Sequence, residues 1–206
     1  MRIKICGITR YEDARTAASL GVDALGFIFS SQSQRYISPA NAAEITRRLP
    51  PFVSKVGVFV NEDPRRVLEA AQIAGVDTIQ LHGDESPEYC AAIPLPVIKA
   101  LQVGDNFGLS AISAYKGIAG ILLDTWDPER RGGSGRTFDW NAAIKACHSC
   151  DTIILSGGLS PSNIQEAIET VHPYAVDVNS GVEISPGVKN PYKMREVVSI
   201  VKKFKG

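Results

Sequence analysis

Short apolar runs alternate with amphipathic stretches along the whole chain. The runs are continuously apolar, as expected of strands buried on both faces of a parallel sheet. The stretches between them have the length and spacing of helices that bury one face. The pattern predicts eight strands, at Ile3–Cys6, Ala24–Phe29, Val53–Val60, Thr78–Leu81, Val97–Ala100, Ile118–Asp124, Thr152–Ser156 and Tyr174–Val178.

Helix ends are marked by capping residues. A capping residue precedes a proline five times, which places the proline at the first helical position, where its missing N–H costs nothing. Thr9 and Glu12 have the spacing of a capping box, Asp139 is a further cap candidate, and residues 106–115 form the least regular helix. Gly21 and Gly75 end helices before strands. The five capped starts are Ser38-Pro39, Asp63-Pro64, Ser86-Pro87, Ser160-Pro161 and Asn190-Pro191.

The number of strand–helix units decides between the α/β architectures. Eight units in 206 residues leave about 26 residues each, close to the minimum for a closed barrel. An open doubly wound sheet would carry GxGxxG after its first strand, whereas this strand ends Cys6-Gly7-Ile8-Thr9. We therefore expect a single-domain (β/α)₈ TIM barrel formed by residues 1–206.

Composition limits the kinds of binding partner that the chain can have. The 22 basic and 22 acidic side chains cancel, which excludes binding of nucleic acid or an anionic membrane by the chain as a whole but not a local basic site. No apolar run reaches the ~20 residues of a membrane span, and the first residues enter a strand directly, so no signal peptide is expected. We expect a cytoplasmic protein with reduced thiols. Cys147 and Cys150 form a lone CxxC, interpreted as the end of a helix.

Chemically useful side chains follow several of the predicted strands. Active sites of such barrels lie where the strands end, and Cys6, Arg35, His82 and Asp124 all fall there. A desolvated Asp124 suits a general acid, and a thiol facing a helix N-terminus suits a base or nucleophile. The plainer alternatives are a capping aspartate, a small buried cysteine and a solvated loop arginine. For Cys6, position alone favours neither interpretation.

The last two strands carry a phosphate-binding signal. Gly157-Gly158 would let backbone N–H groups approach an anion, and Ser180-Gly181 adds a hydroxyl and a second open backbone. Tight turns alone would explain one such pair, but two pairs on adjacent strands favour phosphate binding. Asp177 lies on the same edge.

Other features restrict the chemistry. Three histidines cannot build a histidine-rich metal site, so we expect no metal, and His148 and His172 are taken as structural. The glycine-rich segment from Arg131 to Arg136 follows the sixth strand and is interpreted as a lid over the site.

Six segments together resemble the phosphoribosylanthranilate isomerase family, the (β/α)₈ enzymes of tryptophan biosynthesis. They run in the family's order from residue 4 to residue 189, and Ser134, Asn190 and Gln34 are small departures from its pattern. The segments are Lys4-Ile5-Cys6-Gly7-Ile8-Thr9, Gln80-Leu81-His82-Gly83, Leu123-Asp124-Thr125, Gly132-Gly133-Ser134-Gly135 with Phe138-Asp139-Trp140, Leu155-Ser156-Gly157-Gly158-Leu159, and Asp177-Val178-Asn179-Ser180-Gly181-Val182-Glu183 followed by Pro186-Gly187-Val188-Lys189.

The resemblance implies an Amadori rearrangement of a small-molecule substrate, N-(5-phosphoribosyl)anthranilate, which needs one acid, one base and no cofactor. Cys6 falls on the family's general base, Asp124 on its general acid and Arg35 on the residue that holds the anthranilate carboxylate. The loops with Gly157, Gly158, Ser180 and Gly181 fall on its phosphate site, and His82 and Asp177 complete the expected substrate-binding set. Because an ordinary thiol is mostly protonated at neutral pH, we expect the pKa of Cys6 to be depressed.

Two alternatives stay open at this stage. An indole-glycerol-phosphate synthase relative would use lysine and glutamate at the strand ends, where Lys99 is the only lysine so placed, and a ribulose-phosphate epimerase relative would want metal-binding histidines. A catalytically silent barrel that only binds a sugar phosphate would not need both Cys6 and Asp124. Monomer and homodimer are both compatible with the sequence.

Overall fold

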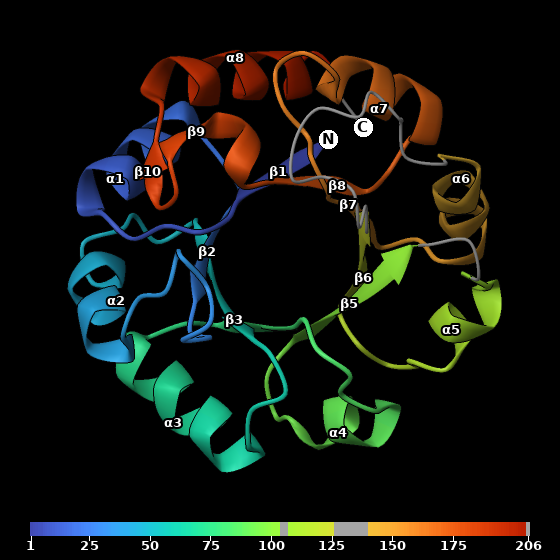
Figure 1. Cartoon of the computed structure of the whole chain (residues 1–206), viewed down its shortest axis with the longest axis horizontal. Helices are drawn as coiled ribbons and strands as arrows, with labels where there is room; N and C mark the ends of the chain where they lie inside the picture. Colours follow the sequence, from blue (N-terminus) through green and yellow to red (C-terminus); the bar gives the residue numbers. More distant parts are fainter. Residues whose placement is uncertain (104–106, 126–139, 205–206) are drawn as a thin grey trace.

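Eight parallel strands close into a barrel in which each strand pairs with its neighbours in sequence and β8 pairs with β1 (Figure 1). The computed structural model describes residues 1–103, 107–125 and 140–204. All eight predicted strands are confirmed, with ends that differ by up to three residues. They are β1 Arg2–Ile5, β2 Ala24–Ile28, β3 Ser54–Phe59, β4 Thr78–Leu81, β5 Val97–Val103, β6 Gly120–Thr125, β7 Ile153–Leu155 and β8 Ala175–Val178.

Helices form a ring outside the barrel, which confirms the (β/α)₈ fold (Figure 1). The helix expected over residues 106–115 is shorter, because its regular part covers only five residues after Gly108. Cys147 lies in the last turn of its helix and Cys150 just beyond it, as interpreted from the sequence. The helices are α1 Tyr11–Leu20, α2 Pro39–Thr46, α3 Pro64–Ala74, α4 Pro87–Ala92, α5 Leu109–Ser113, α6 Trp140–Ser149, α7 Ile164–Val171 and α8 Pro191–Val201.

Local capping signals place most of the helix starts. The side chains of Ser38, Asp63, Ser86 and Asn190 each accept a hydrogen bond from a backbone N–H in the first turn, as predicted. The prediction for Ser160 is wrong. Its backbone N–H donates to Asn163 Oδ1 at 2.8 Å, so the chain turns once more and α7 begins only at Ile164.

The predicted capping box at Thr9 is also wrong. The Thr9 hydroxyl donates to the carbonyl of Gly187 at 2.6 Å, and α1 begins after Arg10 with no side-chain cap. A partner 178 residues away has replaced the local one. The cap candidate Asp139 lies outside the described residues.

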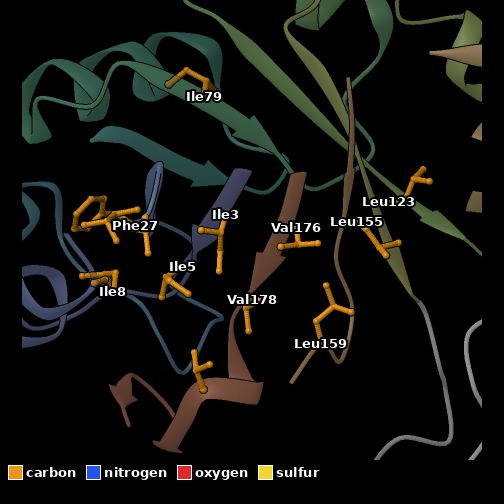
Figure 2. Close-up of a cluster of buried hydrophobic side chains, with 14 of the residues drawn as sticks. Ile3, Ile5, Ile8, Phe27, Ile79, Leu123, Leu155, Leu159, Val176 and Val178 are labelled. Carbon is orange, nitrogen blue, oxygen red and sulfur yellow. The ribbon is translucent and has the colours of Figure 1, made fainter. Parts of the chain in front are cut away.

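Strand parity divides the core in two. Odd-numbered side chains of β1, such as Ile3 and Ile5, point outward into the large cluster between barrel and helices, which Figure 2 shows. The inside of the barrel holds a separate small cluster. Alternation along a strand therefore decides whether a residue supports the helices or can reach the barrel interior. The interior cluster consists of Ile98, Ala100, Leu122, Ile154 and Ala175.

A short hairpin after β8 was not predicted. It consists of β9 Glu183–Ser185 and β10 Val188–Lys189, preceded by the 3₁₀ turn η1 Ser180–Val182. Strands of three and two residues are too short to show a periodicity in the sequence. Among the described residues, no helix is both long and apolar enough to cross a membrane.

Candidate active site

One cavity opens at the carboxyl ends of the strands and collects most of the predicted site residues. Its lining includes Cys6 from the end of β1, His82 from the end of β4 and Asp124 from β6. Arg35 and Gly181 do not line it. The full lining is Cys6, Ile28, Val58, Gln80, His82, Asp124, Ser156, Gly157, Gly158, Leu159, Asp177, Asn179 and Ser180.

The thiol of Cys6 is buried at this cavity. Burial raises the pKa of Cys6 above its ordinary value, and the nearby ammonium of Lys4 lowers it only in part. The expected depression of the Cys6 pKa is therefore wrong for the unliganded protein, because desolvation of the thiolate outweighs its attraction to the ammonium. A raised pKa means that less of Cys6 is thiolate at neutral pH, but each thiolate is a stronger base.

Lys4 and Asp177 form a buried ion pair inside the barrel, beside Cys6. Lys4 Nζ lies 2.6 Å from Asp177 Oδ2, and both side chains are about 95% buried. Burial alone would lower the pKa of Lys4, but Asp177 and Cys6 raise it overall, so Lys4 carries a firm positive charge. Asp177 lines the cavity, and its Oδ1 is buried with no hydrogen-bond partner among the described residues.

His82 lies between Gln80 and Asp124 in the cavity wall and contacts both. His82 Nε2 lies 3.1 Å from Asp124 Oδ2, and His82 Nδ1 lies 3.0 Å from Gln80 Nε2. Gln80 lies two residues before His82 and faces the same way, as strand alternation requires. The carboxyl of Asp124 is thus hydrogen-bonded from one side and partly open to the cavity on the other.

The loops after β7 and β8 provide the open backbone that phosphate binding requires. Gly157 and Gly158 both have positive φ, 91° and 63°, so their N–H groups are presented without a side chain. A Cβ on Gly181 would meet the carbonyl oxygen of Leu159 at 1.9 Å, so Gly181 is needed for the two loops to touch. Ser180 lines the cavity at this junction.

Arg35 is held beside the cavity rather than in its wall. Its guanidinium donates to both oxygens of Glu183, with the shortest contact 2.7 Å from Nη2 to Oε2. Lys189 Nζ donates to Glu183 Oε1 at 2.8 Å. Burial raises the pKa of Glu183, but the hydrogen bonds from Arg35 and Lys189 lower it overall. Two cations around one carboxylate leave one positive charge in excess, which favours an anionic ligand.

The remaining predictions fall outside this cavity. Lys99 points away from the barrel interior. On the outside of the barrel its Nζ binds Glu85 Oε2 at 2.9 Å and the carbonyl of Gly83 at 2.5 Å, so it is not a synthase-type catalytic lysine. The lid segment from Arg131 to Arg136 lies outside the described residues. In the described ranges, no three His, Cys, Asp or Glu side chains are grouped closely enough to hold a metal ion.

Sequence reasoning assigned no role to four residues that organise the site, namely Lys4, Gln80, Glu183 and Lys189. Lys4 and Gln80 share strand parity with Cys6 and His82, and that spacing of two could have identified them. Glu183 and Lys189 lie in the unpredicted hairpin, and no local pattern indicates them.

Comparison with known proteins agrees with this architecture. The family described as N-(5'-phosphoribosyl)anthranilate (PRA) isomerase matches residues 3–200. The N-(5'-phosphoribosyl)anthranilate isomerase of Pelobacter propionicus is 47% identical over 202 residues, which cover 98% of this chain and 96% of that one.

Two solved structures extend the match to three dimensions. A phosphoribosyl anthranilate isomerase in complex with reduced 1-(o-carboxyphenylamino)-1-deoxyribulose 5-phosphate superposes with a TM-score of 0.89 at 41% identity, covering 99% of this chain and all of that one. Monomers of the dimeric phosphoribosylanthranilate isomerase from Thermotoga maritima give 0.89 at 39% identity with the same coverage.

Proposed function

The chain belongs to the N-(5'-phosphoribosyl)anthranilate isomerase family, and from this premise we propose how its own residues carry out the reaction. The protein is an isomerase of tryptophan biosynthesis that converts N-(5-phosphoribosyl)anthranilate to 1-(2-carboxyphenylamino)-1-deoxyribulose 5-phosphate. The observation that supports the mechanism is that Cys6 and Asp124, from different strands, line one cavity with the loops after β7 and β8.

In the first step Asp124 acts as the general acid. The furanose ring opens when the bond from C1′ to the ring oxygen breaks, and the proton of Asp124 goes to that oxygen. The lone pair of the anthranilate nitrogen assists and forms a Schiff base at C1′. The side chain of Asp124 is 30% exposed, so the desolvation expected from the sequence is wrong, because the carboxyl opens onto the cavity. The proposed role rests instead on its position in the cavity wall and on its hydrogen bond with His82.

In the second step Cys6 acts as the general base. Its thiolate removes the proton from C2′, and the electron pair of that bond gives an enolamine, which tautomerises to the aminoketone. One acid and one base suffice, and the reaction needs no cofactor. Lys4 supports the base, because a firmly charged ammonium beside the thiol stabilises its ionised form.

Substrate binding divides between the two ends of the cavity. The backbone at Gly157, Gly158 and Gly181 with the hydroxyl of Ser180 is proposed to bind the phosphate. Arg35 keeps donors beyond those used by Glu183, since a guanidinium has five N–H groups, and is proposed to bind the anthranilate carboxylate.

His82 and Asp177 are proposed to contact the sugar. His82 lines the cavity next to the acid, and the carboxylate of Asp177 belongs to the same lining. The proposal also includes a single domain over residues 1–206, a monomer or homodimer, and a cytoplasmic compartment, which the four free thiols support.

A fluorescence assay with freshly made phosphoribosylanthranilate tests the proposal. We expect the purified chain to consume the substrate, and Cys6→Ala and Asp124→Ala each to lower turnover at least about a hundredfold with the fold intact by circular dichroism. Near-normal turnover of either variant would remove that residue from its role. No turnover by the unmodified chain would reject the proposed function.

A further inference from the structure

A chain of hydrogen bonds runs from the barrel interior to the proposed acid. Gln80 is 99% buried, its Nε2 lies 3.0 Å from His82 Nδ1, and His82 Nε2 lies 3.1 Å from Asp124 Oδ2. All three side chains line the cavity. Gln80 Oε1 is buried without a partner among the described residues, so the amide takes part in this series of hydrogen bonds only through its nitrogen.

The amide nitrogen of Gln80 faces His82 Nδ1 and can only donate a hydrogen bond. This contact selects the tautomer of His82 in which Nδ1 is the acceptor. A neutral imidazole then has its proton on Nε2, which donates to Asp124 Oδ2. An imidazolium would place an N–H on Nδ1 opposite the donor of Gln80, and two donors facing each other at 3.0 Å repel.

This arrangement determines which oxygen of Asp124 can carry the acid proton. Because Oδ2 accepts from His82, the proton of the neutral carboxyl is left to Oδ1. If His82 became an imidazolium, it would form an ion pair that stabilises the carboxylate and removes the proton that the ring oxygen needs.

We propose that Gln80 is a positioning residue of the acid, which keeps His82 neutral with its proton on Nε2 and so keeps the acid proton on Oδ1 of Asp124. The inference rests on the proposed function for the role of Asp124. The other ionisable side chains that line the cavity are Cys6, just after β1, and Asp177 on β8, and the latter is paired with Lys4.

The charged side chains near the loop after β4 are bound to other residues outside the barrel. Glu85 is paired with Lys99, and Asp84 accepts from Asn61 Nδ2. The substitutions proposed below replace none of these groups, so a change in pH dependence reports on Gln80 and His82.

Nitrogen-15 NMR of the imidazole rings tests the hydrogen-bond chain without reference to activity. The chain has only three histidines, and His82→Asn identifies the signals of His82 by their loss. We expect the neutral tautomer with the proton on Nε2 in the unmodified protein at pH 7.5. A proton on Nδ1, or an imidazolium at that pH, would overturn the inference even if the enzyme is active.

The pH dependence of kcat/KM tests the consequence for catalysis. Gln80→Glu replaces the donor with a carboxylate, which favours an imidazolium at His82 and hence the ionised form of Asp124. The basic limb, which reports loss of the acid proton, should move to lower pH by at least about one unit. Gln80→Met removes the donor without adding charge and should move it in the same direction by less.

Matched controls separate this role from a structural one. Gln72→Glu adds the same charge on the exposed face of α3 and should leave the limb in place. In a His82→Asn background, Gln80→Glu should produce no shift, because the coupling passes through the imidazole. The inference would be overturned if the basic limb of the kcat/KM pH profile did not move in Gln80→Glu. It would also be overturned if that limb moved equally with and without His82. Failure of the assay in the unmodified chain would instead count against the proposed function.

Discussion

Two buried lysine–carboxylate pairs lie on opposite sides of the barrel wall. Lys4 and Asp177 meet at 2.6 Å inside the barrel, and Lys99 and Glu85 meet at 2.9 Å outside it. All four side chains are at least about 95% buried, so the two pairs carry similar desolvation penalties. They differ in what surrounds them.

The outer pair has its hydrogen bonds completed by the protein. Lys99 Nζ also binds the carbonyl of Gly83, and Glu85 accepts from the backbone N–H groups of Asn61 and Gly83. These bonds fix the loop that follows β4. The inner pair lies beside Cys6, and among the described residues Asp177 Oδ1 has no hydrogen-bond partner. The same chemistry thus holds a loop in place outside the barrel and places a charged pair at the cavity inside it.

The largest expected effect is on stability, in the outer pair. Lys99→Met leaves Glu85 buried without its cation, which typically costs about 3–5 kcal/mol in the free energy of unfolding. Urea denaturation measures the loss, and kcat measured where the variant is folded should stay within about threefold of the original. A large fall in kcat with unchanged stability would reverse the roles given to the two pairs.

The next effect is on turnover, in the inner pair. Lys4→Met removes the ammonium beside Cys6 and should lower kcat by about a hundredfold, the range of an acid–base contribution. It also leaves Asp177 buried without its cation, so it should lower the free energy of unfolding by an amount similar to that of Lys99→Met. Steady-state kinetics on protein shown to be folded measure it. Lys4→Arg keeps the charge and should recover part of the loss. If Lys4→Met and Lys99→Met reduced kcat equally, the comparison would fail.

A smaller effect is expected on substrate affinity. Arg35→Ala removes the proposed partner of the anthranilate carboxylate and should raise KM about tenfold, with less change in kcat, since a hydrogen bond to a charged group is worth about 1.5–3 kcal/mol. Initial rates over a range of substrate concentrations give the two constants. An unchanged KM would show that Arg35 serves only to hold Glu183.

The smallest effect is the pH dependence of thiol reactivity. Because burial raises the pKa of Cys6 above its ordinary value of 9.0, the thiol is protonated at neutral pH and its alkylation by iodoacetamide should accelerate only as the pH rises past that value. Mass spectrometry of the Cys6 peptide follows the rate. Lys4→Met should move the midpoint further up, whereas Lys99→Met should leave it unchanged. A midpoint below pH 9.0 would contradict the assigned environment.

Short sequence patterns account for the helices and strands and for the end of the barrel at which the site lies. Apolar runs placed all eight strands, and four prolines preceded by capping residues placed helix starts, because those bonds close within three residues. The order of the strands then brought Cys6, His82 and Asp124 to one cavity, as expected. The predicted capping box at Thr9 and the predicted helix start at Ser160 are wrong because other hydrogen-bond partners were available in the folded chain.

The sequence by itself determined the barrel, its units and the side chains at its carboxyl edge, since burial patterns and caps act over a few residues. The tertiary structure alone decided which lysine lies beside the thiol, that Glu183 holds Arg35, and that the pKa of Cys6 rises rather than falls. The physical reason is distance along the chain. Lys4 meets Asp177 across 173 residues and Arg35 meets Glu183 across 148, and desolvation depends on every segment packed around a group.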